Sequence, residues 1–93
     1  MIKYGEYEFV FDYDLLVARI ISFTRYNDLT LAELDQLADI GGGNCANIVS
    51  GMKNSKMATW LSIVNAMDDN PSDYFYIRHR GETDHYRNTS FTR

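Results

Sequence analysis

The chain has 93 residues, and its nine Lys and Arg side chains against thirteen Asp and Glu give it a formal net charge of −4. This length predicts one domain with one hydrophobic core and excludes a second domain. The excess of acidic residues argues against a protein that coats nucleic acid without regard to sequence. The single cysteine, Cys45, excludes an internal disulfide, and no apolar stretch is long enough to span a bilayer. We therefore expect a cytoplasmic protein that does not contact membranes.

The N-terminal segment alternates aromatic and polar residues, which predicts a strand over residues 3–13. Its aromatic side chains share one face: Tyr7, Phe9, Phe11 and Tyr13. A lone strand leaves its backbone hydrogen-bonding groups unpaired, and the only comparable run lies at residues 74–77. We expect these two segments to pair, either within the chain or between two protomers.

Apolar residues recur at helical spacing from Asp14 onward, which predicts a first helix that ends at residues 27–28. Either Asp12 or Asp14 can cap its N-terminus. A second helix begins at Thr30, because Thr30 and Glu33 have the spacing of a capping box. The apolar face of this second helix comprises Leu31, Leu34 and either Leu37 or Ala38.

Three consecutive glycines at residues 41–43 end the second helix, and residues 44–50 form a third helix of about two turns before Gly51 stops it. The apolar side of the third helix consists of Cys45, Ile48 and Val49. A fourth helix over residues 57–68 has apolar residues suited to core packing, namely Met57, Trp60, Leu61, Val64 and Met67. Pro71 then favours a new helical start.

Two short helices joined by a glycine-containing turn, followed by a loop and an amphipathic helix, are the layout of a helix-turn-helix unit. Residues 14–75 match it through Thr30-Leu31-x-Glu33-Leu34, Ile40-Gly41, Ile48 with Gly51, Lys53-Asn54-Ser55, Trp60-Leu61-x-Ile63-Val64-x-Ala66-Met67 and Pro71-Ser72-Asp73-Tyr74-Phe75. The segment resembles the DNA-binding domain of the Cro and lambda-type phage repressor family. The resemblance implies a bundle of about five short helices. Together with the predicted N-terminal strand, this makes a mainly α fold in one domain over residues 1–77.

The chain departs from the family pattern within this unit. Asp35 stands where a small residue normally follows the leucine of the second helix, and Asp39 replaces the usual turn glycine. Gly42 and Gly43 occupy positions whose side chains read bases in the family. Because a glycine has no side chain with which to contact a base, direct readout would fall to the asparagines that follow.

The charges are distributed unevenly along the chain. No Lys or Arg occurs between residues 27 and 52, so contacts with DNA phosphates would come from Lys53 and Lys56 or from Arg19 and Arg25 on the first helix. Residues 78–93 carry four arginines and two acidic residues, a net charge of +2, whereas residues 1–77 carry five basic and eleven acidic side chains, a net charge of −6. We expect a basic, flexible tail that either follows a DNA backbone or is simply solvated.

The resemblance implies a small sequence-specific DNA-binding transcriptional regulator that acts as a homodimer on a double-stranded operator. The residues expected to contact DNA are Asn44 and Asn47, which read bases, Ser50 and Asn54, which support them, and Lys53 and Lys56, which bind phosphates. No nucleophile, base and orienting acid occur at spacings that suggest catalysis. We therefore expect neither enzyme activity nor catalytic residues, and no cofactor or metal.

A second class of function fits the same residues. The acidic second helix, the glycines at the reading positions and the aromatic ends favour a module that has kept the helix-turn-helix fold but binds a protein target. Such a protein would be an antirepressor, an antitoxin or an inhibitor of a host defence nuclease. An acidic surface can imitate the charge of DNA and block a basic groove.

Overall fold

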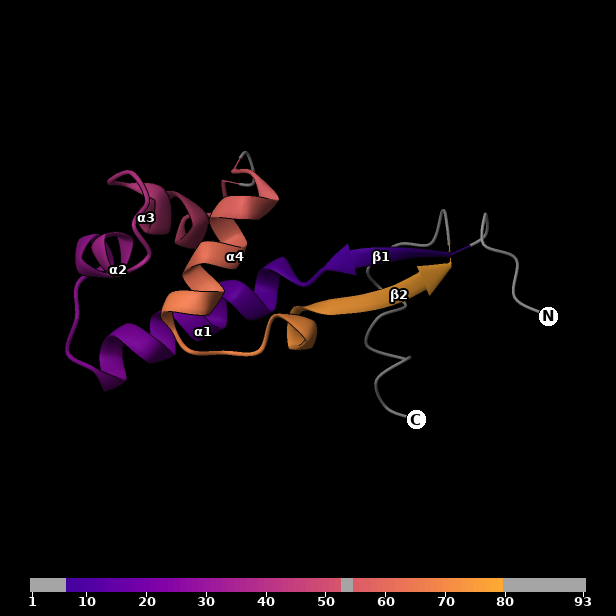
Figure 1. The fold of residues 1–93 in the computed structure, drawn as a ribbon, viewed down its shortest axis with the longest axis horizontal. Coiled ribbons are helices and arrows are strands. Elements are labelled where there is room, and N and C mark those ends of the chain that lie inside the picture. The colour runs from indigo at the N-terminus through magenta and orange to yellow at the C-terminus, as the bar shows by residue number, and fades with distance from the viewer. Residues whose placement is uncertain (1–6, 53–54, 80–93) are drawn as a thin grey trace.

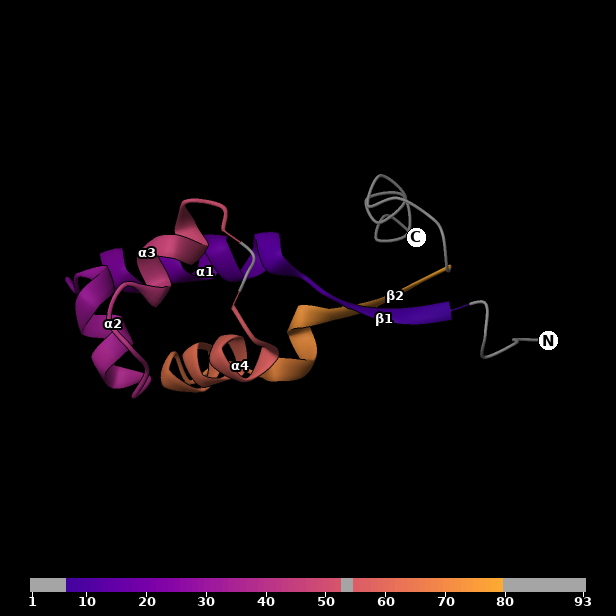
Figure 2. The same cartoon turned by 90° about the horizontal axis from the view of Figure 1, so that it is seen from above.

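The computed structural model describes residues 7–52 and 55–79. The fold is mainly helical, with a two-stranded antiparallel sheet (Figure 1). The elements in order are β1 (Tyr7–Phe11), α1 (Tyr13–Tyr26), α2 (Leu31–Leu37), α3 (Asn44–Val49), α4 (Met57–Ala66), the 3₁₀ helix η2 (Pro71–Tyr74) and β2 (Phe75–His79). The α-helices gather at one end, and the two strands extend away from them as a ribbon (Figures 1 and 2). Within the described ranges no helix combines the length and hydropathy needed to cross a membrane.

The two ends of the domain pair with each other, which confirms the predicted pairing within the chain. β1 and β2 are antiparallel, and the register runs from Tyr7 opposite His79 to Phe11 opposite Phe75. The bounds differ from the prediction, because Tyr13 begins α1 and Tyr74 belongs to η2. β2 also continues through His79, two residues past the predicted end of the domain. The rest of the predicted tail, 80–93, and strand residues 3–6 lie outside the described residues.

The N-termini of α1 and α2 carry caps that the sequence predicts. The Asp12 side chain accepts a hydrogen bond from the Leu15 amide at 3.1 Å, so Asp12 rather than Asp14 caps α1. The capping box of α2 is complete, since the Thr30 amide donates to Glu33 at 2.8 Å and the Glu33 amide donates to the Thr30 hydroxyl at 3.1 Å. Each bond satisfies an amide that has no partner inside its helix.

All four described α-helices end in the same way. The residue after each C-cap has a positive φ, from 56° to 102°, and these residues are Asp28, Asp39, Gly51 and Asp68. The amide of the next residue then bonds back to a carbonyl five residues earlier, as in Ile40 to Asp35 at 3.1 Å and Met52 to Asn47 at 2.9 Å. This is the Schellman arrangement, which normally uses glycine at the positive-φ position. Aspartate takes the place of glycine at three of the four ends.

The core lies between the helices and extends to the start of the ribbon. Its fully buried side chains are Leu16, Ile20, Leu34, Cys45, Ile48, Ile63, Val64 and Tyr74. On α4 one detail differs from the expected apolar face, because Ile63 is a core residue whereas Met57 is exposed. At the end of α2 the structure decides between the two predicted alternatives: Ala38 packs against the core and Leu37 is exposed. Trp60 packs against the core and also stacks on Phe11, with ring centroids 4.8 Å apart, and so joins α4 to β1.

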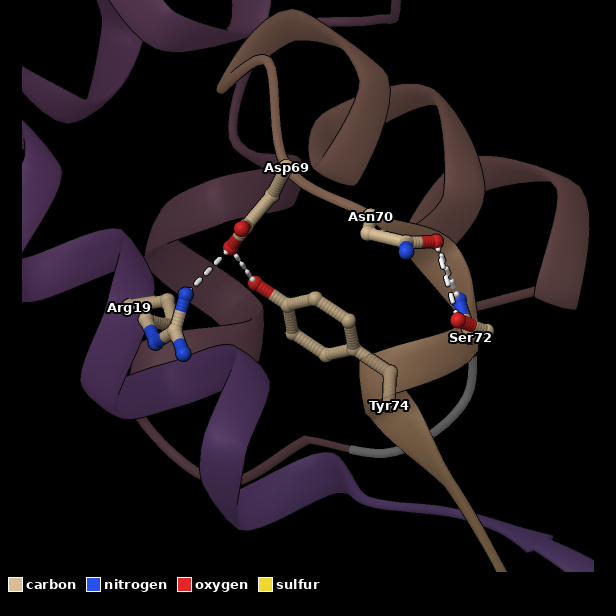
Figure 3. Close-up of polar contacts among 5 residues, drawn as sticks. All are labelled: Arg19, Asp69, Asn70, Ser72 and Tyr74. Atoms are coloured by element: carbon tan, nitrogen blue, oxygen red, sulfur yellow. Dashed lines mark hydrogen bonds and ion pairs between the residues drawn. The ribbon is translucent and has the colours of Figure 1, made fainter.

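A polar cluster ties α1 to the segment that follows α4 (Figure 3). One Asp69 carboxylate oxygen lies 2.6 Å from an Arg19 guanidinium nitrogen and accepts a 2.5 Å hydrogen bond from the Tyr74 hydroxyl. The pKa of Asp69 is held below its ordinary value by the hydrogen bond from Tyr74 and by the positive charge of Arg19. Burial raises the pKa of Tyr74, and the neighbouring carboxylate raises it further. The cluster therefore holds Asp69 ionised and Tyr74 protonated at neutral pH.

Candidate nucleic-acid interface

Helices α2 and α3 and the turn between them contain most of the residues that the sequence singles out. α3 lies beside α2, which is at the end of the helical bundle that is remote from the ribbon (Figure 1). Gly43 is the N-cap of α3, and its φ of +89° is one that residues with a side chain rarely adopt. Glycine offers no side-chain oxygen to the first amides of the helix. The hydrogen-bond acceptor for these amides must come from elsewhere.

Asp35 supplies that acceptor from α2. Its side chain is 2% exposed, and its two oxygens accept hydrogen bonds from the Gly43 amide at 3.0 Å and from the Cys45 amide at 2.9 Å. A carboxylate at a helix N-terminus is also favoured by the helix dipole. Asp35 thus fixes α3 relative to α2, and the amides that it occupies are no longer available to a DNA phosphate.

Cys45 is a buried core residue, as the sequence predicts. Burial, together with the hydrogen bond and negative charge of Asp35, raises the pKa of its thiol to about 12. A thiol with so high a pKa carries little thiolate at neutral pH, so Cys45 is a poor nucleophile. It packs α3 against the core.

The C-terminal end of α3 is held by Tyr13, the first residue of α1. The Tyr13 hydroxyl lies 2.7 Å from the Ile48 carbonyl oxygen and 2.6 Å from the Met52 carbonyl oxygen. Because one hydroxyl carries a single proton, the two carbonyls share it as acceptors. Burial raises the pKa of Tyr13, and the charge of Asp14 raises it further, so the hydroxyl remains a donor. α3 is therefore held at both ends by side chains from other helices.

The structure places the predicted site residues in different environments. Asn47 and Ser50 are exposed on α3, and the Ser50 hydroxyl donates to the Asn47 carbonyl at 2.8 Å. Asn44 is half-buried, and its side-chain amide donates to the Gly41 carbonyl at 2.7 Å. Lys56 is exposed at the N-cap of α4. The two remaining predicted residues, Lys53 and Asn54, lie outside the described residues.

Asn44 therefore stabilises the turn through an amide group that base readout would also need. The described side chains that are exposed on α3 and can form hydrogen bonds are Asn47 and Ser50. Gly42, which precedes the N-cap of α3, has space for a side chain, since a Cβ built there meets no atom within 4 Å and its φ is not positive.

The surface around α2 and α3 is acidic. Asp28, Glu33 and Asp39 are exposed there, whereas Asp35 is buried. Arg19 on α1 is already paired with Asp69, which leaves Lys56 and Arg25 as the described, exposed cations among the predicted phosphate contacts. Contacts with DNA phosphates would have to overcome repulsion from this acidic surface.

Two residues that position α3 were not identified from the sequence. The sequence shows Asp35 only as a departure from the family pattern, and its alternation predicts Tyr13 on the aromatic face of a strand. The missing cap at Gly43 was the available signal for Asp35, because a helix that begins at glycine needs an acceptor from another segment. Tyr13 had no local signal, since its partners lie 35 and 39 residues away.

Comparison with known proteins gives no significant match, whether with protein-family models, curated protein sequences or solved structures.

Proposed function

We propose that the protein is a small sequence-specific DNA-binding transcriptional regulator that acts as a homodimer on a two-fold operator. In this proposal α2 and α3 form a helix-turn-helix unit of the lambda-repressor type, and α3 enters the major groove. The observation that supports it best is the way α3 is held. It is only six residues long, yet Asp35 bonds to its N-terminus and Tyr13 to its C-terminus.

A helix of this length is not stable by itself in water, so these contacts determine where it lies. The side chains that α3 leaves exposed are Ala46 and Asn47, followed by Ser50 at the C-cap. Direct base readout requires a side chain that is positioned within about 0.5 Å, because a bidentate amide contact with adenine is sensitive to geometry. A short helix fixed at both ends, with an amide side chain on its outer face, is suited to this task.

Selection from a random duplex library at ~50 mM salt tests the proposal, since electrostatic binding is strongest at low salt. We expect a two-fold symmetric site. Asn47→Ala should relax the preference at one base pair of each half-site, at a cost of about 1–3 kcal/mol for the preferred base. Asn65→Ala is the matched control, because Asn65 is exposed on α4. Failure to bind any duplex at this salt would contradict the proposal.

Gly42 allows the opposite kind of experiment, a gain of binding. Gly42→Lys should raise the affinity for all duplexes and steepen the salt dependence by about one unit, because it adds one phosphate contact beside α3. Asn65→Lys adds the same charge on α4 and controls for the change in net charge. Equal gains from both variants would mean that α3 does not face the DNA.

The acidic surface supports a second candidate function. Asp28, Glu33 and Asp39 are exposed around α2 and α3. This surface is negatively charged, as DNA is, whereas the surface with which a protein contacts DNA is usually positively charged. We infer as the alternative that the protein binds the basic DNA groove of another protein, as an antirepressor, an antitoxin or an inhibitor of a nuclease. The test is competition with DNA for a basic partner. Under this alternative Glu33→Lys weakens the complex, whereas under the first proposal it strengthens DNA binding.

A further inference from the structure

The ribbon formed by β1 and β2 exposes two large apolar side chains next to each other. Phe9 and Ile77 are direct partners in the register, and they are 76% and 56% exposed. Directly opposed residues on neighbouring strands point to the same face of a sheet. Phe9 and Ile77 therefore form one apolar patch at the middle of the ribbon.

The two faces of the ribbon differ in charge. Side chains alternate along a strand, so Tyr7 and His79 share the face of Phe9 and Ile77. The other face carries the ion pair between Glu8 and Arg78, at 2.8 Å, and the nearly buried Tyr76. The patch face thus contains no Lys, Arg, Asp or Glu within the described strands.

The uncharged surface is limited to this face of the ribbon. An open depression of about 390 Å³ borders Phe9, but it is lined by Glu8, Asp14 and Arg78 as well as by apolar side chains. A two-stranded ribbon is marginally stable in water unless one of its faces packs against another element. Beyond Phe11, where the ribbon extends away from the helices, the patch face of the described chain has no such cover (Figure 1).

We propose that this face is where two copies of the chain associate, ribbon against ribbon, about a two-fold axis. Each copy has a net charge of −4, so like-charge repulsion is lowest where the contacting faces carry no charge. The helices lie at one end of the ribbon (Figure 2), so an axis perpendicular to the strands places the two bundles at opposite ends without a clash. The interface is isologous, and Phe9 and Ile77 meet their own counterparts because they lie at the middle of the ribbon, where the axis passes.

The size of the face predicts how strong this association is. A five-residue ribbon is about 17 Å long and only two strands wide. Such a face is smaller than the roughly 800 Å² per partner of a standard interface. The dimer is therefore weak, and it forms at protein concentrations on the order of 10–100 μM.

This inference rests on the proposed function, because it names the surface through which the proposed homodimer forms. Self-association is measured without DNA, so its test is independent of DNA binding. Sedimentation velocity over 5–500 μM (roughly the range set by that affinity) should show a monomer–dimer equilibrium for the full chain. Phe9→Glu and Ile77→Glu should each weaken it at least ~10-fold, because they place equal charges opposite each other across the two-fold axis. Leu37→Glu is the matched control: Leu37 is an exposed apolar residue of α2, distant from the ribbon.

A monomer at every concentration would overturn the proposal, and so would a dimer that Phe9→Glu and Ile77→Glu leave intact. Circular dichroism of each variant shows whether it has kept its helices, and the two substitutions are made at exposed sites. If the monomer instead bound phosphatidylcholine vesicles and Phe9→Glu abolished this binding, the patch would belong to a lipid surface and the proposal would fail. The DNA experiments are separate, because DNA binding by a monomer would leave the proposed function standing while this inference fails.

Discussion

Asp35 of α2 and Asp39, which follows the C-cap of that helix, are departures from the family pattern that the structure explains. Asp35 is buried because it accepts hydrogen bonds from the Gly43 and Cys45 amides. Asp39 has a φ of +57°, which is the conformation that a turn glycine adopts without strain. One aspartate therefore replaces a cap that α3 lacks, and the other occupies a position at which glycine would be easier.

Asp35→Ala should lower the free energy of unfolding by about 2–4 kcal/mol, because it leaves the buried Cys45 amide and the part-buried Gly43 amide without their acceptor. Asp35→Asn should cost about half as much, since its single side-chain oxygen can still accept one bond. Urea denaturation measures both values. Glu33→Ala is the comparison at an exposed cap of α2, with an expected loss of about 1 kcal/mol. A loss below about 0.5 kcal/mol in Asp35→Ala would contradict the role assigned to this carboxylate.

Asp39→Gly should stabilise the protein by about 0.5–1 kcal/mol, because glycine adopts a positive φ at no steric cost. Asp28→Gly should have a similar effect, since Asp28 has a φ of 56°. Asp14→Gly is the control and should lower the stability, because Asp14 lies within the first turn of α1 and glycine weakens a helix there. Thermal denaturation distinguishes a gain of stability from a loss. A loss of stability in Asp39→Gly would show that the aspartate side chain itself contributes to the turn.

At the scale of elements, α3 depends on the rest of the fold more than the other helices do. Its six residues contribute Cys45 and Ile48 to the core, and the side chains that hold its ends come from α1 and α2. α2, by contrast, carries its own capping box at Thr30. We therefore expect α3 to lose its structure first when a distant contact is removed.

Tyr13→Phe tests this dependence, because it removes only the hydroxyl that bonds to the C-terminal end of α3. The variant should lose about 1–2 kcal/mol of stability. Hydrogen exchange should accelerate at the amides of Gly51 and Met52 more than at those of α4. Tyr26→Phe is the matched control, since Tyr26 is 91% exposed and should show neither effect. Uniform acceleration across all helices would instead indicate a global loss of stability.

At the scale of the whole molecule, Asp69 connects two distant parts of the chain. Its bonds to Arg19 and Tyr74 hold α1 against the segment between α4 and β2 (Figure 3). The pKa of its carboxyl group is lowered in the folded state, by the Tyr74 hydroxyl first and by Arg19 second. A lowered folded-state pKa contributes stability that is present above the unfolded-state pKa and is lost as the pH falls through the folded-state value.

The free energy of unfolding should therefore decrease as the pH falls below about 4, where the unfolded carboxyl group begins to bind its proton. Asp69→Asn should be less stable at pH 7 and should lose less stability between pH about 4 and pH 2, because it has no proton to gain there. Urea denaturation at each pH measures the slope. Asp73→Asn, at an exposed position of η2, is the matched control for the removal of one carboxylate. Identical slopes for Asp69→Asn and the unmodified protein would contradict this contribution.

Local interactions made most of the fold predictable from the sequence. The caps at Asp12 and Thr30 join residues three positions apart, so local spacing indicates where these two helices begin, with Asp14 as the alternative for the first. Helical periodicity located all four α-helices, and the pairing of the two ends followed because few segments have the alternation of a strand. The candidate residues of α3 also followed from spacing, since periodicity shows which positions face the core.

The tertiary structure decided which of those residues are occupied by other contacts. Asn44 bonds within the turn, and Asp35 bonds to the start of α3 from eight and ten residues away. Tyr13 bonds to the C-terminal end of α3 from more than 30 residues away. Such contacts depend on how the helices pack and leave no periodic signal in the sequence. The exposure of Phe9 has the same cause: alternation places it on a face of the strand, but only the packing of that strand shows that the face is uncovered.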